Sequence, residues 1–208
     1  MSALALIARL LEYPEDTGLL AHLDEAASEI DAADLAPAAR EGLEHFLAWV
    51  RLTDPIVVQE SYVESVDRSR RGSLHLFEHV HGESRERGAA MIDLRQFYAE
   101  RGFEMAASEL PDYLPVVLEF ASRAPEAERM RFLAEIVPVV ARIHAFHARQ
   151  GSPWEPVLAA ALVASGGTLE LSRAQVPGNT PEPSIDELWA EPEVVFSGDC
   201  STPTGDAK

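Results

Sequence analysis

Apolar residues recur at three- and four-residue spacing along most of the chain, and this helical periodicity is the strongest constraint on the fold. The longest periodic segment runs from Pro125 to Gln150, where Pro138 is expected to kink the helix because it removes a backbone donor. No useful alternation of apolar and polar residues appears, and neither does an internal repeat. We therefore predict an all-α fold, an orthogonal bundle of about eight or nine helices.

Prolines and capping residues predict where several helices begin and end. The first helix should span Ala3–Tyr13 and end before Pro14, since a residue preceding proline avoids helical geometry. Pro37 suits the first turn of another helix, because its missing N–H has no helical partner at that position. Asp54 followed by Pro55 combines a capping side chain with a preset φ, so it predicts a further helix start.

The second half of the chain carries similar signals. Residues 73–81 predict a short helix that ends at Gly82, because glycine adopts positive φ at little cost. Ser84 should cap the next helix, and Pro111 is expected in the first turn of a later one. Residues 152–155, Ser-Pro-Trp-Glu, are typical of a capping box at the start of the final core helix.

Composition divides the chain into three regions. We predict a helical domain over 1–166, a flexible linker rich in Gly, Pro, Ser and Thr over 167–184, and a C-terminal element with a polar tail over 185–208. The single cysteine, Cys200, lies in that tail and cannot form an internal disulfide, which fits a reducing compartment.

The net charge of −18 is concentrated at the two ends of the chain. Residues 1–67 hold 14 acids and 3 bases, whereas residues 68–150 hold 12 of each and residues 151–208 hold 9 acids and 2 bases. Such a chain lacks the basic face that nucleic acids require, and anionic membranes would repel it. A basic peptide would be attracted at long range, although the acids can also serve solubility alone.

The apolar start of the chain does not resemble a targeting or membrane segment. No Lys or Arg precedes its apolar run, Arg9 interrupts it, and no small-residue cleavage site follows, so we do not expect a signal peptide. No apolar run approaches the roughly 20 residues that a membrane span needs. We therefore expect a cytoplasmic protein without membrane insertion.

Residues 73–94 are the stretch densest in groups that can both pack and do chemistry. They contain His75, Glu78 and His79, which match H-x-x-E-H, the inverted zinc-protease motif. On a helix the two histidines would share a face and could bind one ion, with the glutamate as base. Zinc catalysis needs a third ligand, and the sequence offers no privileged candidate. Ordinary hydrogen-bonded histidines are the simpler interpretation.

Two further groups of polar residues allow more than one interpretation. Five arginines could hold the phosphates of a nucleotide or pterin, or could simply pair with the surrounding acids; they are Arg68, Arg70, Arg71, Arg85 and Arg87. Asp112 beside Tyr113 reads as an exposed polar pair at a helix start, where an acid compensates the helix dipole.

Several blocks, in order along nearly the whole chain, resemble the NarJ family of nitrate reductase assembly chaperones, within the wider TorD-like group. They are ARLLEYP (8–14), YVE with Asp67 (62–67), SLHLFEHVHGESRERG with MIDL (73–94), ELPDYLPVVLEF (109–120) and IDELWAEPEVVF (185–196). In the family pattern the position of His75 is not reliably histidine, which removes the first ligand of the zinc alternative.

The resemblance implies an all-helical chaperone that is not an enzyme and holds no cofactor of its own. Family members bind the N-terminal segment of the catalytic (alpha) subunit of respiratory nitrate reductase. They hold the apoenzyme until molybdenum cofactor is inserted and the complex docks at the membrane. Molybdenum cofactor delivery proteins are candidate further partners. A TorD-like chaperone for another molybdoenzyme is the alternative, and a zinc hydrolase is a more distant one.

The wider group carries a Glu-x-x-Asp-His hinge, which Glu109 and Asp112 match while Tyr113 replaces the histidine. The resemblance therefore implies a binding role for this position, not a titrating one. Ser65-Val66 replaces the expected Thr-Phe before Asp67, so that turn is expected to pack differently.

We predict that the partner peptide is basic and amphipathic and lies as a helix in an apolar groove. Apolar contacts should set the affinity, and charge should speed the encounter. Protonation of the histidines could modulate the grip. The predicted peptide contacts are Tyr62, Asp67, Leu76, Phe77, His79, His81, Glu109, Asp112, Tyr113, Leu114 and Val117.

Overall fold

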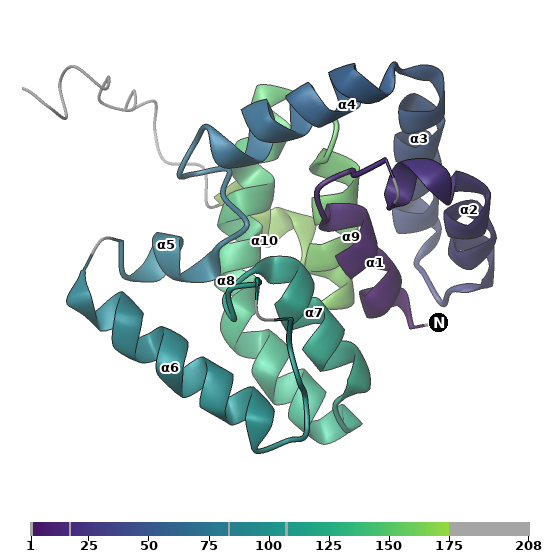
Figure 1. Cartoon of the computed structure of the whole chain (residues 1–208). Coiled ribbons are helices and arrows are strands. Elements are labelled where there is room, and N and C mark those ends of the chain that lie inside the picture. Colours follow the sequence, from purple (N-terminus) through teal and green to yellow (C-terminus); the bar gives the residue numbers. More distant parts are fainter. Residues whose placement is uncertain (1, 17, 83, 107, 175–208) are drawn as a thin grey trace, which may run out of the picture. The chain divides into compact units, whose positions relative to one another are not determined.

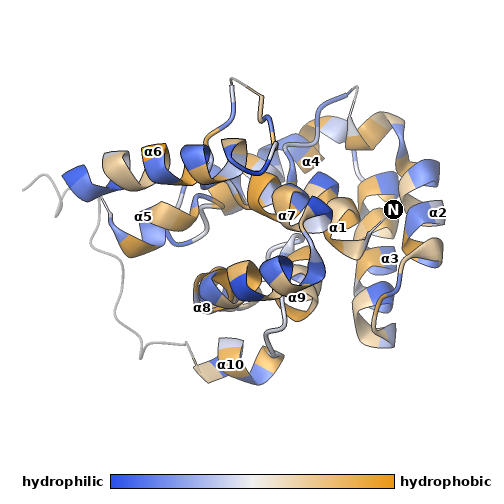
Figure 2. Ribbon diagram, turned by 90° about the horizontal axis from the view of Figure 1, so that it is seen from below, coloured by the Kyte–Doolittle hydropathy of each residue, from blue (hydrophilic) through white to orange (hydrophobic). Residues whose placement is uncertain are grey.

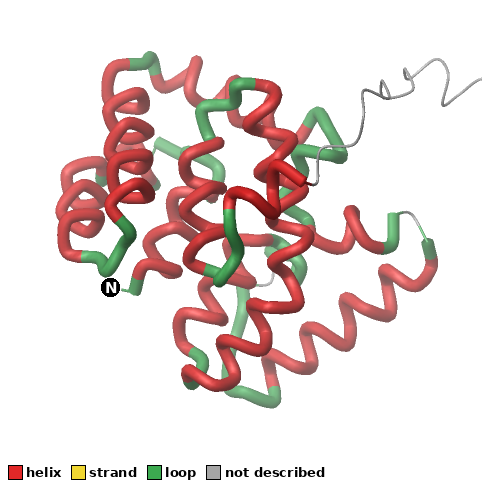
Figure 3. The backbone as a smooth tube through the Cα atoms, turned by 180° about the vertical axis from the view of Figure 1, so that it is seen from behind, coloured by secondary structure: helices red, strands yellow, loops and turns green. Residues whose placement is uncertain are grey.

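The computed structural model describes residues 2–16, 18–82, 84–106 and 108–174, which belong to the first of two compact units, Met1–Val176. Across these residues the chain forms ten α-helices and no strand (Figure 3). An isolated antiparallel bridge joins His75 to Tyr113. The predicted all-α class is confirmed, while the C-terminal element predicted at 185–208 lies outside the described residues.

The helices follow one another closely along the chain. Their bounds are α1 Ala3–Leu11, α2 Leu23–Ala32, α3 Pro37–Leu52, α4 Pro55–Tyr62, α5 Leu76–Val80, α6 Arg85–Ala99, α7 Leu114–Arg123, α8 Glu126–Gln150, α9 Glu155–Ala164 and α10 Leu169–Ala174. A short 3₁₀ helix, η1 (Leu19–Ala21), precedes α2, and a π-helical turn, η2 (Val63–Asp67), continues α4. No helix of the described part combines the length and the apolar character that a membrane crossing needs.

Helix α1 lies at the centre of the main core and packs against both α7 and α9 (Figure 1). Its apolar positions place Leu6, Ile7, Leu10 and Leu11 out of contact with water. Helix α9 is apolar along its length and also packs against α3 and α8. Because α1 is enclosed on several sides, its C-terminal end is held firmly against α7, where the cavity described below opens.

A second, aromatic core joins α6 to α7 and α8. Tyr98 of α6 packs against Phe103 and Phe120, and its hydroxyl donates to the Pro111 carbonyl at 3.0 Å. The rest of α6 alternates hydrophilic and apolar residues (Figure 2), in keeping with a helix that is buried only at its C-terminal end.

Several helix starts and ends lie where the sequence predicted them. Helix α3 begins at Pro37, and α4 begins at Pro55 with the Asp54 carboxylate accepting from the Ile56 N–H at 2.9 Å. Gly82 has φ +59° just beyond α5. These signals are local, so tertiary packing did not displace them.

Other predicted boundaries are wrong. Helix α7 begins at Leu114 with Pro115 in its first turn, so Pro111 precedes it. The capping box at Ser152 does not form, because its hydroxyl accepts from the Trp154 N–H at 3.3 Å while α9 starts at Glu155.

Two further expectations need correction. Ser84 precedes α6 without a capping hydrogen bond from its side chain. Helix α10 (Leu169–Ala174) occupies the start of the segment predicted as a linker, and its Ser172 hydroxyl hydrogen-bonds His144 at 2.6 Å.

Candidate functional site

A cavity of about 620 Å³ opens where the end of α1 meets η2, residues 103–106, Glu109 and the start of α7. It brings together four of the predicted contact residues, Tyr62, Asp67, Glu109 and Tyr113. We call it the acidic cavity, because carboxylates line much of its wall.

Two tyrosines form the inner wall of the acidic cavity. The Tyr62 hydroxyl donates to the Leu11 carbonyl at 2.9 Å and lies 2.9 Å from the Tyr113 hydroxyl. The Tyr13 ring packs edge-on against Tyr62 with 5.5 Å between ring centroids, and the His75 ring lies 5.2 Å from that of Tyr113. The wall is therefore aromatic and fixed by hydrogen bonds to the end of α1.

Acidic side chains far outnumber basic ones around this aromatic wall. The lining carboxylates are Glu12, Glu15, Asp67, Glu104, Glu109 and Glu119. Arg9 is the one arginine among the lining residues, and its guanidinium donates to both Glu29 carboxylate oxygens at 3.0 Å. Because that charge is already paired, the cavity keeps a negative potential that attracts cations.

Burial and mutual repulsion shift the titration of these groups. Burial raises the pKa of Glu12, and the neighbouring Glu119 carboxylate raises it further. Burial also raises the pKa of Asp67, with His75 opposing the change. The pKa of Tyr113 rises to about 12 through burial, so its hydroxyl stays neutral at physiological pH. A bound cation would stabilise the ionised carboxylates.

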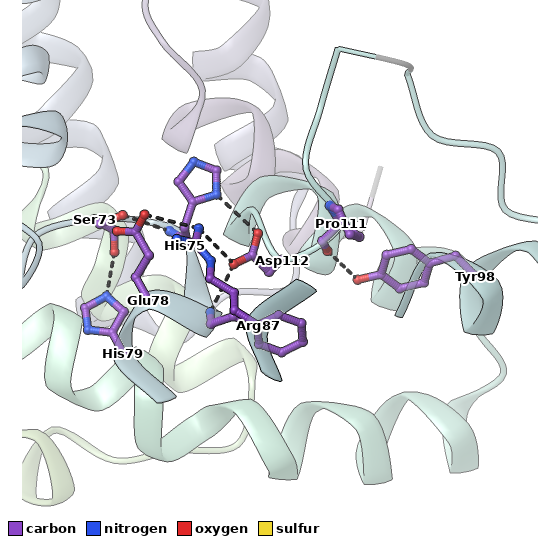
Figure 4. Close-up of polar contacts among 9 residues, drawn as sticks. Ser73, His75, Glu78, His79, Arg87, Tyr98, Pro111 and Asp112 are labelled. Carbon is purple, nitrogen blue, oxygen red and sulfur yellow. Dashed lines mark hydrogen bonds and ion pairs between the residues drawn. The ribbon is translucent and has the colours of Figure 1, made fainter. Parts of the chain in front are cut away.

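Asp112 was expected at an exposed helix start, and this expectation is wrong. Its side chain is 0% exposed, and its carboxylate accepts from the Phe77 N–H at 3.0 Å and from His75 Nδ1 at 3.3 Å (Figure 4). Arg87 approaches the same carboxylate at 4.0 Å and pairs with Glu78 at 3.2 Å. Asp112 thus caps α5 from a distant segment and fixes α5 to the start of α7.

The same geometry argues against the zinc alternative. Helix α5 begins at Leu76, so His75 precedes the helix and does not share a helical face with His79. His79 Nε2 donates to the Ser73 carbonyl at 2.8 Å, and Glu78 is paired with Arg87. Among the described residues, no group of three or more His, Cys, Asp or Glu side chains is arranged to hold a metal ion.

Three predicted groove residues belong to the core instead. Leu76, Leu114 and Val117 are buried in the main core, so in this structure they support the fold and offer almost no surface to a peptide. Phe77 and His81 line a second cavity of about 600 Å³ between α5, α6 and α8, separate in its lining from the acidic cavity.

The sequence analysis also missed residues that line the acidic cavity. Tyr13 and Glu12 come from the end of α1, and Phe103 and Met105 come from the segment before α7. The signal for Tyr13 was its place just before Pro14, where the helix must end and the side chain can turn outward.

Comparisons with known proteins show which family this chain is similar to. A family model described as "Nitrate reductase delta subunit" matches residues 32–160. The chain is 36% identical to the nitrate reductase molybdenum cofactor assembly chaperone NarJ of Escherichia coli K12 over 206 residues, covering 96% of this chain and 86% of the relative.

Two further relatives are similar in sequence. The probable nitrate reductase molybdenum cofactor assembly chaperone NarW of Escherichia coli K12 is 34% identical, covering 97% of this chain and 87% of the relative. A probable NarJ of Bacillus subtilis strain 168 is 38% identical over 94 residues, covering 45% of this chain and 51% of the relative.

Proposed function

The chain belongs to the nitrate reductase delta subunit family, and on that premise we propose that it is a nitrate reductase assembly chaperone. It binds the N-terminal segment of the catalytic subunit and holds the apoenzyme while molybdenum cofactor is inserted. The chaperone itself makes and breaks no covalent bond, and the cofactor belongs to its client.

The acidic cavity is the observation that carries this proposal. A segment with Lys or Arg side chains would meet Glu12, Asp67 and Glu109 while its apolar side chains pack on Tyr13 and the neighbouring aromatic wall. An amphipathic helix presents both kinds of side chain at three- and four-residue spacing. The cavity therefore favours a basic, amphipathic client segment.

Apolar contact should supply most of the affinity. Burial of apolar surface stabilises a complex by roughly 25 cal/mol per Å², whereas an exposed ion pair contributes about 0.2–1 kcal/mol. The net charge of −18 mainly speeds the encounter and orients the segment. Such a complex forms quickly and can also release its client once assembly is complete.

Isothermal titration calorimetry with a synthetic client leader tests the proposal. We expect saturable binding of the nitrate reductase leader and weak or absent binding of a scrambled peptide of the same composition. The leader of a different molybdoenzyme should also bind weakly. Equal binding of all three peptides would reject a specific chaperone function.

The site is tested by a pair of alanine variants. Tyr13→Ala removes an exposed ring from the cavity wall and should weaken leader binding by about tenfold, the effect expected when a contact worth about 1.4 kcal/mol is lost. Met130→Ala removes an exposed apolar side chain of α8 that does not line the cavity, so it should bind as the wild type does.

A further inference from the structure

Helix α4 exposes apolar side chains that a helix of a monomeric bundle would normally bury. Ile56 is 64% exposed, and Val63, the first residue of η2 directly after α4, is 38% exposed. The two positions are seven residues apart, which places them on one face and two helical turns, about 10 Å, from each other. Together on one face, these two side chains form a small apolar patch, and its value as a binding surface depends on the shape and charge around it.

This face is hollowed and adjoins the acidic cavity. A hollow of about 500 Å³ is lined by Ile56, Val63 and Tyr13, together with charged side chains of α4 and η2. Tyr13 lines the acidic cavity as well, so one ring forms a wall of both. We call the surface formed by Tyr13, Ile56 and Val63 with Glu60 and Glu64 the α4 groove.

The α4 groove is held in a fixed place relative to the acidic cavity. The Gln59 side-chain amide donates to the Pro14 carbonyl at 3.1 Å and to an Asp16 carboxylate oxygen at 3.2 Å. Tyr62, at the last position of α4, donates to the Leu11 carbonyl. The middle and the C-terminal end of α4 are therefore anchored to the end of α1 and to the chain that follows it.

We propose that the α4 groove binds a second stretch of the same client segment, continuous with the stretch held in the acidic cavity. This inference rests on the proposed chaperone function and extends its binding site by about two helical turns. The occupant is an amphipathic helix whose apolar side chains cover Ile56 and Val63 and whose Lys or Arg side chains meet Glu60 and Glu64.

Charge favours this occupant over a second copy of the chain. Glu60 and Glu64 are exposed beside the groove, where Arg68 is the one basic lining residue. Antiparallel pairing of two α4 helices would bring these carboxylates close to their equivalents, and each chain carries a net charge of −18. A basic segment would not meet this electrostatic repulsion.

The test compares the same substitution at two exposed isoleucines. Ile56→Asp changes the α4 groove, and the control Ile92→Asp changes α6, where the side chain is 69% exposed and lines neither cavity nor groove. Each substitution adds one negative charge, which by itself attracts a basic peptide. A loss of affinity at Ile56 alone therefore reports a lost apolar contact.

Calorimetry uses the full chain and the synthetic leader peptide of the nitrate reductase catalytic subunit. We expect Ile56→Asp to weaken binding by about tenfold or more, Ile56→Ser to weaken it by a smaller factor, and Ile92→Asp to leave it unchanged. Circular dichroism melts check that the variants fold. If Ile56→Asp does not fold, the comparison is made with Ile56→Ser instead.

The possible failures are distinguishable. If the wild type does not bind the leader, the proposed function fails and this inference fails with it. If the wild type binds and both Ile56 variants bind equally well, the α4 groove is not part of the site while the function stands. If sedimentation shows that Ile56→Asp dissolves a dimer without changing leader affinity, the occupant is a second copy, and the inference is overturned.

Discussion

The hydroxyl oxygens of Tyr62 and Tyr113 lie 2.9 Å apart, and this contact joins the end of α4 to the start of α7. Tyr62 donates onward to the Leu11 carbonyl, so three segments meet at one short chain of hydrogen bonds. The inner wall of the acidic cavity is therefore built from groups that also stabilise the fold.

The two tyrosines should differ in their contribution to stability. Tyr62→Phe leaves the Leu11 carbonyl without its principal donor and should lower the free energy of unfolding by about 1–3 kcal/mol. Tyr113→Phe removes the 2.9 Å contact to the Tyr62 hydroxyl and a 3.5 Å contact to the Leu11 carbonyl, but it leaves the Tyr62 bond to that carbonyl in place, so it should cost about 0.5–1.5 kcal/mol. Urea unfolding measures both. A larger loss for Tyr113→Phe would contradict this order of hydrogen bonds.

The Asp112 carboxylate should stabilise the fold mainly through its hydrogen bonds and less through its charge. Asp112→Asn replaces one buried carboxylate oxygen by an NH2 group, which cannot accept the hydrogen bond from the Phe77 N–H or from His75 Nδ1. We expect a loss of about 1–3 kcal/mol by urea unfolding. Glu78→Gln, which removes a more exposed charge from the same ion-pair group, is the matched control and should cost less.

Burial of His147 should make the protein less stable as the solution becomes mildly acidic. His147 is buried, donates through Nε2 to the Gly72 carbonyl at 3.0 Å and contacts the Ser152 hydroxyl at 2.9 Å. Burial lowers its pKa below the ordinary value of 6.5, so the unfolded chain takes up the proton first. The stabilising effect of neutral His147 is complete above pH 6.5 and is lost as the pH falls toward the lowered pKa.

Urea midpoints at pH 7.5 and pH 5.5 measure this dependence. His147→Gln should reduce the difference between the two midpoints, although it also lowers both. His45→Gln, on the exposed face of α3, should leave the difference as it is in the wild type. An unchanged difference in His147→Gln would mean that other groups cause the acid sensitivity.

Leader binding should also weaken in acid, for a different reason. Burial raises the pKa of Glu12 and of Asp67 in the free protein, and a basic peptide binds their ionised forms more tightly. Affinity should therefore be constant at high pH and fall as these carboxylates take up protons. Calorimetry of Asp67→Asn should give weaker binding with a shallower pH dependence, whereas a pH-independent wild type would contradict the electrostatic part of the account.

The helix starts at Pro37 and Pro55 could be predicted because their signals are contained within a few residues. The start of α7 could not, because Asp112 caps α5 across 35 positions of sequence and holds Pro111 outside the helix. Long-range caps leave no local pattern, which is why an apparent helix-start acid proved to be buried.

The candidate site was only partly predictable for a related reason. Helical periodicity marks Leu114 and Val117 as apolar positions of one face, but it does not tell a core face from a groove. Leu114 is 0% exposed, so Leu114→Asp would unfold the protein and report nothing on binding. The sequence does not indicate that Ile56 is exposed. Val58, a similar apolar residue two positions later on the same short helix, is fully buried.

Photo-crosslinking of the client leader tests the central claim most directly. A leader peptide carrying a benzophenone side chain is irradiated with the full chain, and mass spectrometry locates the attachment. We predict attachment at the lining of the acidic cavity, within residues 12–15, 62–67 and 103–109. Attachment within residues 90–101 and 128–135, around the second cavity, or no attachment above that of a scrambled peptide, would contradict the account.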